Sequence, residues 1–489
     1  MAGLEPGEYP VVVVGSGPGG LQTSYCLSRL GVEHVVITAD DAPGGMFRRY
    51  PIFQRLLSWS KPDAPVERTT RDYEWFDHNS LLADEPKYKA LVPAEMDRSY
   101  FVPSRPEMER GLAAFASQCG LPIRYGCTWE STRREDDGSL TLTTTDGEFR
   151  CRAAVFALGV TEPWKSDIPG IEHVPHYVDT GEPRDYEGKR VIVIGKRNSG
   201  FEIADGLLPW ARQVLLVSRR PTQTSVLALS SVRVRYLQPL EDHGLGGGTL
   251  ALDAAIERVE KMESGFRIFA TGTTRPCELA LDCDAAIAAT GFRAPLRDLG
   301  ELGVMTVSQG RIPALTPFFE ATGSPGIYFA GNATQGAPGL RKHGVGASSP
   351  AVHGFRYNAR ILARHLAETR FGVELERPVV ADPVTFLAHE LTHAPELWTQ
   401  KAYLARVVSF TDGAARDEGI EPLAHFVDAP GADAIAATVE MDAAGEIYPV
   451  LYVRRGGDVD ERILHPDPVN AFGNPAYIRA LTQAVTDLT

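Results

Sequence analysis

The chain has 489 residues, 43% of them hydrophobic and 23% charged, which is the composition of a globular protein with two or three domains. Its 49 basic and 63 acidic residues give a net charge of −14, and no run of lysine and arginine interrupts that acidity. Nucleic acid and anionic membrane surfaces are therefore not expected as partners. No apolar stretch approaches the roughly 20 residues of a membrane span, and no signal peptide is visible, so a cytoplasmic location is expected.

The first predicted elements begin a βαβ unit: a strand at residues 11–14, a helix at 18–30 and a second strand at 34–38. In the turn before the helix, Gly15 allows a tight bend, Gly17 lets the backbone approach a pyrophosphate and Gly20 lets the helix pack closely on the strand. Phosphates bind at such a helix N-terminus because its free N–H groups and its dipole attract anions. The residue for the ribose would fall near Thr38, whose hydroxyl can replace the usual carboxylate.

A long irregular segment at residues 46–104, rich in proline, aromatic and charged residues, is predicted to pass over this first dinucleotide. A helix follows at residues 104–118, because Pro106 suits a first helical turn and Gly120 a stop. Alternating strands continue to about residue 158. We predict that residues 1–170 form the first part of the first dinucleotide-binding domain.

A second βαβ unit starts at Lys189, with its helix at about residues 199–210 and its second strand at 213–217. Its turn reads Gly195-Lys196-Arg197-Asn198-Ser199-Gly200. Arg197 occupies the position of the middle glycine, so the backbone approach is less open. Asn198 and Ser199 can still donate hydrogen bonds to a phosphate.

Two arginines, Arg219 and Arg220, end the second strand of this unit where many such units have an acidic residue. An arginine pair there would bind a 2′-phosphate and select NADP over NAD. The alternative is a solvated basic turn.

The remaining chain returns to the first domain and then changes character. A strand ends in Ala289-Thr290-Gly291-Phe292, and residues 326–332 are predicted as a strand that enters a glycine turn before a long helix to about Arg370. From about Ala381 helix and short strands mix. The predicted domains are 171–295 for the second dinucleotide, 296–375 for the second part of the first domain, and 376–489 for an α+β C-terminal extension.

Residues His389-Glu390-Leu391-Thr392-His393 formally match the HExxH zinc pattern, which places two imidazoles on one helix face and a glutamate beside a metal-bound water. Pro395 follows too soon for a long ligand helix, and no third ligand is evident. We therefore expect an exposed polar helix face and no metal. A zinc hydrolase is the distant alternative.

The six cysteines are scattered along the chain, and none forms a C-x-x-C pair. They are predicted to be reduced and mostly buried thiols. Disulfide reduction, which typically needs a closely spaced redox pair, is therefore disfavoured.

The set of motifs resembles the single-component, class B flavoprotein monooxygenases: the flavin-containing monooxygenases, the N-hydroxylating enzymes and the Baeyer–Villiger enzymes. The resemblance covers about residues 9–370. It rests on the order of the following segments: Gly15-x-Gly17-x-x-Gly20, Gly44-Gly45-Met46-Phe47, Val102-Pro103-Ser104-Arg105-Pro106, Ala157-Leu158-Gly159, Gly195 to Gly200 with Glu202, Ala289-Thr290-Gly291-Phe292, and Ile327-Tyr328-Phe329-Ala330-Gly331-Asn332.

The resemblance implies an α/β fold of two Rossmann-like domains, with the NADPH domain inserted into the FAD domain. It assigns FAD to Gly15, Gly17, Gly20, Thr38, Gly45, Gly331 and Asn332. It assigns NADPH to Gly195, Arg197, Asn198, Ser199, Gly200, Arg219 and Arg220.

The resemblance also suggests three catalytic candidates. Flavin-containing monooxygenases carry an Asn before a Ser-Ser-Lys stretch near the flavin; here Ser58 stands at that position, and Lys61 ends the stretch. His176 is the candidate for a histidine that the family carries between its domains, although the surrounding pattern does not match strictly. A capping or core histidine is the alternative for His176.

The implied function is an FAD- and NADPH-dependent monooxygenase that transfers one oxygen atom from O2 to a small molecule. A nitrogen or sulfur nucleophile is favoured over a ketone, because the strict Baeyer–Villiger pattern is missing. Alternatives are Baeyer–Villiger oxygenation of a ketone, an NADPH-dependent flavin reductase or oxidase without oxygen transfer, and a non-catalytic protein with bound cofactor. Neither the substrate nor the oligomeric state follows from the sequence, and a homo-oligomer stays open.

Overall fold

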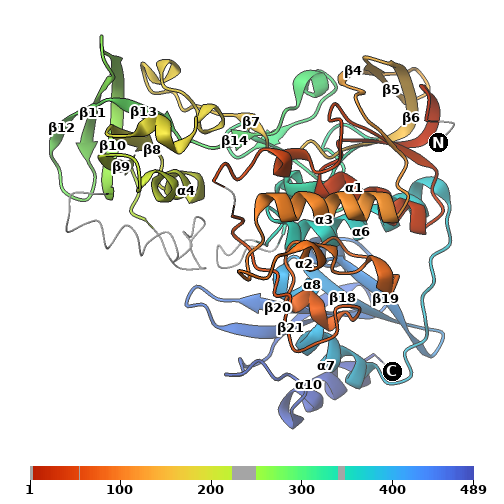
Figure 1. Cartoon of the computed structure of the whole chain (residues 1–489). Helices are drawn as coiled ribbons and strands as arrows, with labels where there is room; N and C mark the ends of the chain where they lie inside the picture. Colours follow the sequence, from red (N-terminus) through yellow and green to blue (C-terminus); the bar gives the residue numbers. More distant parts are fainter. Residues whose placement is uncertain (1–3, 54, 223–248, 340–346, 489) are drawn as a thin grey trace. The chain divides into compact units, whose positions relative to one another are not determined.

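The computed structural model describes residues 4–53, 55–222, 249–339 and 347–488. The chain divides into two compact units (Figure 1). The first contains Met1–Arg48, Ser58–Val160 and Ala294–Thr489, and the second contains Arg49–Leu57 and Thr161–Arg293. In the described ranges no helix is both long enough and apolar enough to cross a membrane.

The first unit is built on a seven-stranded sheet of order β3-β2-β1-β6-β5-β4, with β17 also paired to β6. Its strands are β1 (Gly7–Val14), β2 (His34–Ile37), β3 (Ile123–Arg124), β4 (Trp129–Arg134), β5 (Leu140–Thr144), β6 (Gly147–Phe156) and β17 (Ile327–Phe329). Strands β3, β2, β1, β6 and β17 run parallel, whereas β4 and β5 are antiparallel additions. Four consecutive valines of β1 are buried, as expected for a parallel strand covered on both faces.

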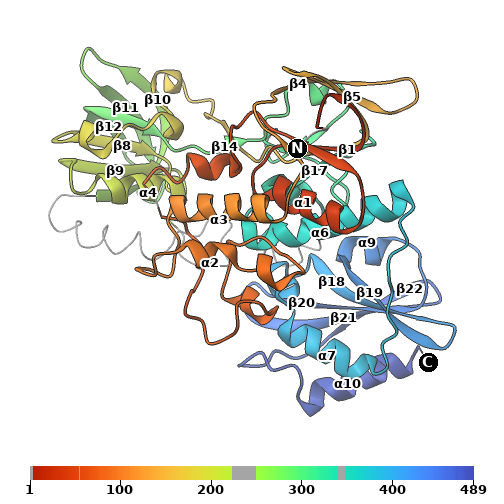
Figure 2. The same cartoon turned by 45° about the vertical axis from the view of Figure 1, so that its right-hand side comes forward.

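Three helices pack together beside this sheet: α1 (Pro18–Arg29), α3 (Arg105–Gln118) and α6 (Val352–Phe371) (Figures 1 and 2). Ser104 caps α3, because its side chain accepts from the Glu107 amide while the Glu107 carboxylate accepts from the Ser104 amide. Gly372, with a φ of 66°, ends α6. The helices predicted at residues 18–30, at 104–118 and up to about Arg370 are therefore confirmed.

The segment predicted as irregular contains only short helices. They include η1 (Gly45–Arg48), η2 (Asp72–Trp75) and α2 (Leu91–Glu95), and the later turn η8 (Gly331–Gly336) belongs to the same unit.

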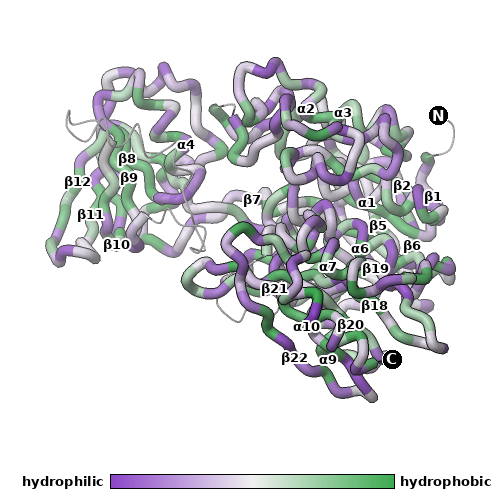
Figure 3. Tube along the Cα trace, turned by 90° about the horizontal axis from the view of Figure 1, so that it is seen from below, coloured by the Kyte–Doolittle hydropathy of each residue, from purple (hydrophilic) through white to green (hydrophobic). Residues whose placement is uncertain are grey.

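The second unit holds a six-stranded sheet of order β12-β11-β10-β9-β8-β13. Its strands are β8 (Arg190–Ile194), β9 (Gln213–Ser218), β10 (Thr249–Lys261), β11 (Phe266–Gly272), β12 (Glu278–Cys283) and β13 (Ala285–Ala288). Strands β13, β8, β9 and the start of β10 are parallel, and β11 and β12 are antiparallel. Helix α4 (Asn198–Leu207) covers one face, and the strands β8 and β9 are mainly hydrophobic in Figure 3.

Residues 49–57 belong to the second unit because Glu202 of α4 holds them. The Glu202 carboxylate accepts hydrogen bonds from the Phe53 amide at 3.0 Å and from the Tyr177 hydroxyl at 2.7 Å. The Phe53 ring packs on Gly206, where an added Cβ would lie 2.6 Å from the ring. Nothing local signals this pairing, since Phe53 and Glu202 are 149 residues apart.

The C-terminal extension contains a five-stranded antiparallel sheet of order β19-β18-β20-β21-β22. The strands are β18 (Leu404–Thr411), β19 (Ala414–Pro422), β20 (Ala434–Met441), β21 (Ile447–Arg455) and β22 (Asp458–Ile463). Helices α7 (Pro383–His393), α8 (Pro395–Thr399) and α10 (Pro475–Thr486) cover one face, and α9 (Leu423–Asp428) packs against the other (Figure 2).

The predicted fold class is confirmed: the chain is α/β, with two Rossmann-like parallel sheets and an α+β extension. The extension packs within the first unit. The domain boundaries at residues 170, 295 and 375 stay predictions.

Candidate functional site

The first glycine turn is fixed by backbone crowding. Gly15 has a φ of 110° and donates its amide to the Ile37 carbonyl at 2.8 Å. A Cβ on Gly15 would lie 2.7 Å from the Ala157 carbonyl oxygen, and a Cβ on Gly20 would overlap the Gly15 carbonyl. Backbone packing therefore requires glycine at both positions, whether or not a ligand is bound.

Two further glycine turns meet this one at the N-terminus of α1. A Cβ on Gly45 would lie 2.8 Å from the Gly17 Cα, and a Cβ on Gly19 would lie 2.5 Å from the Gly331 Cα. The Gly44 amide also donates to the Ser16 carbonyl at 2.9 Å. The structure thus brings together the residues predicted to hold FAD.

Gly17 differs from its neighbours, because the protein does not require a glycine there. Its φ is −73°, and an added Cβ would make an ordinary 3.7 Å contact with Gly45. No side chain caps α1, and the buried Oδ1 of Asn332 has no hydrogen-bond partner in the described part of the chain. An open glycine, an uncapped helix N-terminus and an unpaired buried amide oxygen fit a dinucleotide pyrophosphate.

Thr38 lies buried at the end of β2, beside this turn. Its hydroxyl oxygen accepts from the Ser16 hydroxyl at 3.1 Å and from the Asp40 amide at 3.3 Å. Arg48 of η1 pairs with Asp41 at 2.6 Å and lies 3.5 Å from the Glu109 carboxylate, so it links this edge to α3. Sequence reasoning missed Arg48, although the basic pair that follows Gly44-Gly45-Met46-Phe47 was the available signal.

The second glycine turn repeats the first. Gly195 has a φ of 133° and donates to the Val217 carbonyl at 2.9 Å, and a Cβ on it would collide with Ala289. A Cβ on Gly200 would likewise collide with the Gly195 carbonyl. No side chain caps α4, and the buried Oδ1 of Asn198 has no hydrogen-bond partner among the described residues. This site also fits a dinucleotide.

Lys196, which the sequence did not single out, holds this turn in place. Its buried ammonium group donates to the Leu252 carbonyl at 2.9 Å and forms an ion pair with Asp253. Sequence inspection shows only a lysine inside the motif, so the pairing with β10 was not predictable. Lys196 is therefore occupied within the protein.

The cations that sequence reasoning assigned to NADPH are exposed. Arg197 precedes α4, and Arg219 and Arg220 follow β9. The Thr273 hydroxyl donates to the Arg219 carbonyl at 2.7 Å, which fixes the backbone of the pair. Ser199 lies half-buried in the first turn of α4.

His176 lies buried in the second unit, with both ring nitrogens bound to backbone. Nε2 lies 2.9 Å from the Gly291 carbonyl, and Nδ1 accepts from the Val178 amide at 3.4 Å. One neutral tautomer satisfies both bonds, and burial lowers the pKa of the ring. This geometry fits the capping alternative for His176.

Ser58 and Lys61 lie on one loop of the first unit. The buried Asn79 side chain donates to the Ser58 carbonyl at 3.0 Å and to the Trp59 carbonyl at 3.1 Å. The Tyr73 hydroxyl donates to the Lys61 carbonyl at 2.7 Å, while the Lys61 side chain is exposed, with its ammonium 5.3 Å from the Trp59 ring centre. The loop's backbone is thus held, whereas the lysine is accessible.

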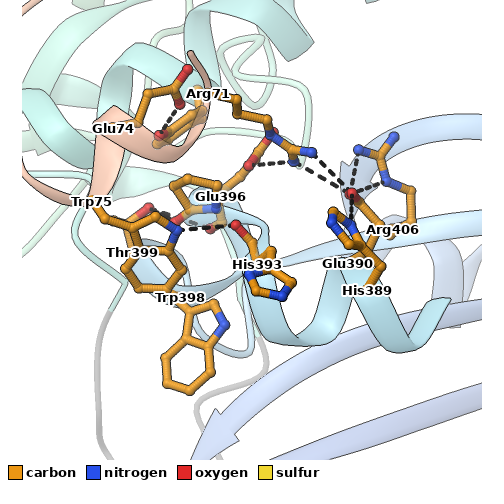
Figure 4. A network of polar contacts seen from close by, with 12 residues as sticks. Arg71, Glu74, Trp75, His389, Glu390, His393, Glu396, Trp398, Thr399 and Arg406 are labelled. Carbon is orange, nitrogen blue, oxygen red and sulfur yellow. Dashed lines mark hydrogen bonds and ion pairs between the residues drawn. The ribbon is translucent and has the colours of Figure 1, made fainter. Parts of the chain in front are cut away.

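The HExxH segment forms the end of α7, and the expected exposed polar face is wrong for its glutamate. The side chain of Glu390 is 4% exposed, whereas that of His389 is 61% exposed. Glu390 accepts from Arg71 at 2.9 Å and from Arg406 at 2.8 Å (Figure 4). Arg71 also binds Glu396 of α8 at 2.8 Å.

These arginines determine the charge of Glu390. Burial alone would raise the pKa of Glu390, but the charge of Arg406 and the hydrogen bonds from Arg71 lower it to about 2. Within the described ranges no three His, Cys, Asp or Glu side chains are grouped so that they could hold a metal ion. The segment is thus accounted for as an anchor between the extension and the segment that contains η2.

The six cysteines are all free, and most are poor nucleophiles. Burial raises the pKa of Cys26 to about 11 and the pKa values of Cys119 and Cys151 to about 12. Thiolate is the reactive form of cysteine, so these side chains are chemically inert near neutral pH.

A flavoprotein with one site for FAD and another for a nicotinamide dinucleotide is the class that the fold and the two turns define. The family model described as pyridine nucleotide-disulphide oxidoreductase matches residues 12–331, and the chain belongs to this family. Family membership and the two sites indicate FAD and NADPH as the cofactors.

The FAD-dependent oxidoreductase domain-containing protein 2 of Mus musculus is 27% identical over 450 residues, which are 84% of this chain and 65% of that protein. The chain therefore spans less than two thirds of the length of this relative. A flavin-containing monooxygenase from Stenotrophomonas maltophilia matches with a TM-score of 0.55 and 21% identity, over 73% of this chain and 98% of that one. A bacillithiol disulfide reductase from Staphylococcus aureus matches with a TM-score of 0.57 and 17% identity, over 74% and 99%. These two structures share the fold, which confirms the predicted resemblance at that level.

We expect Gly17→Ala to abolish flavin retention without unfolding the protein. The methyl group fits the surrounding protein but would stand where the pyrophosphate must approach. The unfolding free energy of the apoprotein should change by no more than about 1 kcal/mol, since φ is already negative. Flavin content by absorbance and apoprotein stability in urea test this, with Gly7→Ala, another unconstrained glycine of the same unit, as the control. Full flavin occupancy in Gly17→Ala would contradict the placement of FAD.

Arg219→Ala and Arg220→Ala should weaken NADPH binding and spare NADH. Loss of a charge-assisted bond to phosphate costs about 1.5–3 kcal/mol, which is roughly a tenfold to hundredfold rise in the dissociation constant. Arg212→Ala removes an exposed arginine at the other end of β9 and should change neither constant. Equal losses for NADPH and NADH would exclude 2′-phosphate recognition.

Glu390→Gln should lower the unfolding free energy at pH 7 by on the order of 3 kcal/mol, because the lowered pKa represents about that much stabilisation. Because the pKa of Glu390 is lower in the folded than in the unfolded protein, its charge stabilises the fold at pH values above the unfolded pKa. The difference in unfolding free energy between the wild type and Glu390→Gln should therefore narrow as the pH falls from about 5 towards 2. Urea unfolding at several pH values measures it. The double variant His389→Gln/His393→Gln is the control and should alter neither stability nor NADPH oxidation. Stoichiometric zinc and activity lost on chelation would overturn the anchoring role.

Proposed function

We propose that the protein is an FAD- and NADPH-dependent monooxygenase that transfers one oxygen atom from O2 to a nitrogen or sulfur nucleophile of a small molecule. When bound, FAD supplies the redox chemistry, by accepting a hydride from NADPH and reducing O2. The chain itself binds both dinucleotides, orients them and excludes water.

The observation that carries the proposal is the combination of two dinucleotide sites with unreactive thiols. Electrons from NADPH need an acceptor beyond the flavin. No C-x-x-C pair exists in the sequence, and burial raises the pKa of Cys26 and Cys151, which lie in the first unit. Because a disulfide relay has no suitable thiols there, O2 is the acceptor that we propose.

The loop of Ser58 and Lys61 is our candidate for the wall of the oxygenation site. Its neighbour Trp59 begins a row of three rings in contact: the Trp59 and His78 ring centres are 4.4 Å apart in a tilted pair, and those of His78 and His353 are 4.6 Å apart in a stacked pair. Such a row joins the loop to the start of α6 and makes a rigid, partly apolar surface. A rigid surface of this kind suits the exclusion of water from a reactive centre.

A nitrogen or sulfur nucleophile attacks the transferred oxygen atom with its own lone pair. It therefore does not depend on a strong acid or base from the protein to activate it. This agrees with His176, whose ring is held neutral between two backbone groups. The role of His176 that we propose is to fix the turn that contains Gly291.

Labelled O2 tests the proposal. Purified protein should be supplied with NADPH, ¹⁸O₂ and a panel of amines, amino acids, sulfides and ketones, while peroxide is measured in parallel. With a matching nitrogen or sulfur substrate, one labelled oxygen atom should appear in the product and peroxide release should fall.

Other results of this labelling experiment would indicate one of the alternative reactions. Label in an ester formed from a ketone would indicate Baeyer–Villiger oxygenation. NADPH converted wholly to peroxide for every compound, or product labelled only from water, would contradict oxygen transfer and indicate an NADPH-dependent reductase or oxidase.

A further inference from the structure

A chain of neutral hydrogen bonds crosses the first unit from the extension to the flavin turn. Gln400, directly after α8, donates its side-chain amide to the Asn358 carbonyl oxygen at 2.7 Å. Asn358 of α6 donates to the Thr334 hydroxyl at 2.9 Å, and Thr334 donates to the Gly331 carbonyl at 2.7 Å. The side chains of Gln400, Asn358 and Thr334 are at most 1% exposed.

The last bond of this chain lies inside the turn η8, which carries both Gly331 and Asn332. The Gly331 backbone is in turn packed on Gly19 at the start of α1, where an added Cβ would lie 2.5 Å from Gly331. A shift of η8 therefore changes the geometry of the site assigned to FAD.

Further bonds fix Gln400 itself. Its amide also lies 3.1 Å from the Ser349 hydroxyl and 3.2 Å from the Gly354 carbonyl, so this one side chain contacts the residues just before α6 and the first half of α6 itself. The family model ends at residue 331, and Asn358 and Gln400 both lie beyond it.

We propose that Gln400 is a positioning residue for FAD, and that through it the C-terminal extension forms a working part of the flavin site. Removal of the Gln400 amide leaves the buried Asn358 oxygen without its donor. Asn358 then must move or stay unpaired, and both responses loosen its hold on Thr334 and on the Gly331 turn.

The test is the affinity of the deflavinated full-length protein for FAD, measured by the quenching of flavin fluorescence. Gln400→Met keeps nearly the same volume and removes the amide. We expect the dissociation constant of FAD to rise by roughly 5- to 50-fold. Thr334→Val should give a similar rise. The double variant should show less than the product of the two single effects, because both changes interrupt one chain.

Thr438→Val is the matched control. Thr438 is a fully buried threonine of the extension whose hydroxyl donates to the Leu404 carbonyl at 2.7 Å, within the extension's own sheet. Its replacement should lower the melting temperature of the apoprotein and leave FAD affinity unchanged. If Gln400→Met does not fold, Gln400→Asn, which keeps an amide on a shorter side chain, takes its place.

Unchanged FAD affinity in the Gln400 variant, or an equal loss of affinity in Thr438→Val, would overturn the proposal. If the rise in the FAD dissociation constant of the double variant equalled the product of the two single rises, the proposal would also be overturned. The measurement involves neither NADPH nor O2, so its failure leaves the proposal of oxygen transfer untouched.

Discussion

The first unit depends on the close approach of three backbone turns at the N-terminus of α1. A Cβ on Gly45 would lie 2.8 Å from Gly17, and a Cβ on Gly19 would lie 2.5 Å from Gly331, so neither Gly45 nor Gly19 can carry a side chain. The turns come from three distant parts of the chain, before α1, at η1 and at η8. Gly17 keeps open space beside this crowded contact and has an ordinary negative φ, which is why we assign the approach of the pyrophosphate to it.

The second unit uses the same crowding with a different surface. An added Cβ on Gly195 or Gly200 would collide with the backbone, as it would on Gly15 or Gly20, but Arg197 stands at the position that Gly17 occupies in the first turn. The second turn therefore presents a charged side chain where the first presents bare backbone. Because the chain as a whole carries a net charge of −14, the exposed cations Arg197, Arg219 and Arg220 would favour a phosphate-rich ligand at one place on an acidic protein, as the sequence predicts.

Local chemistry made much of the fold predictable. The two glycine turns, the start of α3 at Ser104 and the end of α6 at Gly372 are each determined by residues at the turn or helix end itself. What escaped prediction depends on partners far away in sequence. Arg71 and Glu390 are 319 residues apart in the sequence. The HExxH sequence pattern alone does not reveal whether its glutamate faces water, a metal ion or two arginines.

The candidate site divides in the same way. Glycines could be named from the sequence because their role follows from the turn in which they lie. The side chains that hold those turns could not, since a buried glutamine or lysine has no local pattern: Gln400 and Lys196 are recognised only through Asn358 and Asp253.

Two of the networks that attach the extension have opposite chemistry, and their difference has a physical consequence. The network of Arg71, Glu390 and Arg406 is ionic, so its strength depends on Glu390 keeping its charge. The network of Gln400, Asn358 and Thr334 contains only amides and a hydroxyl, which do not titrate between pH 2 and 10. Acid therefore weakens the attachment of the extension near η2 while the bonds that lead to Gly331 stay intact. The network that leads to Gly331 therefore places no titrating charge beside the turn η8, whereas the titrating carboxylate of Glu390 belongs to the other network.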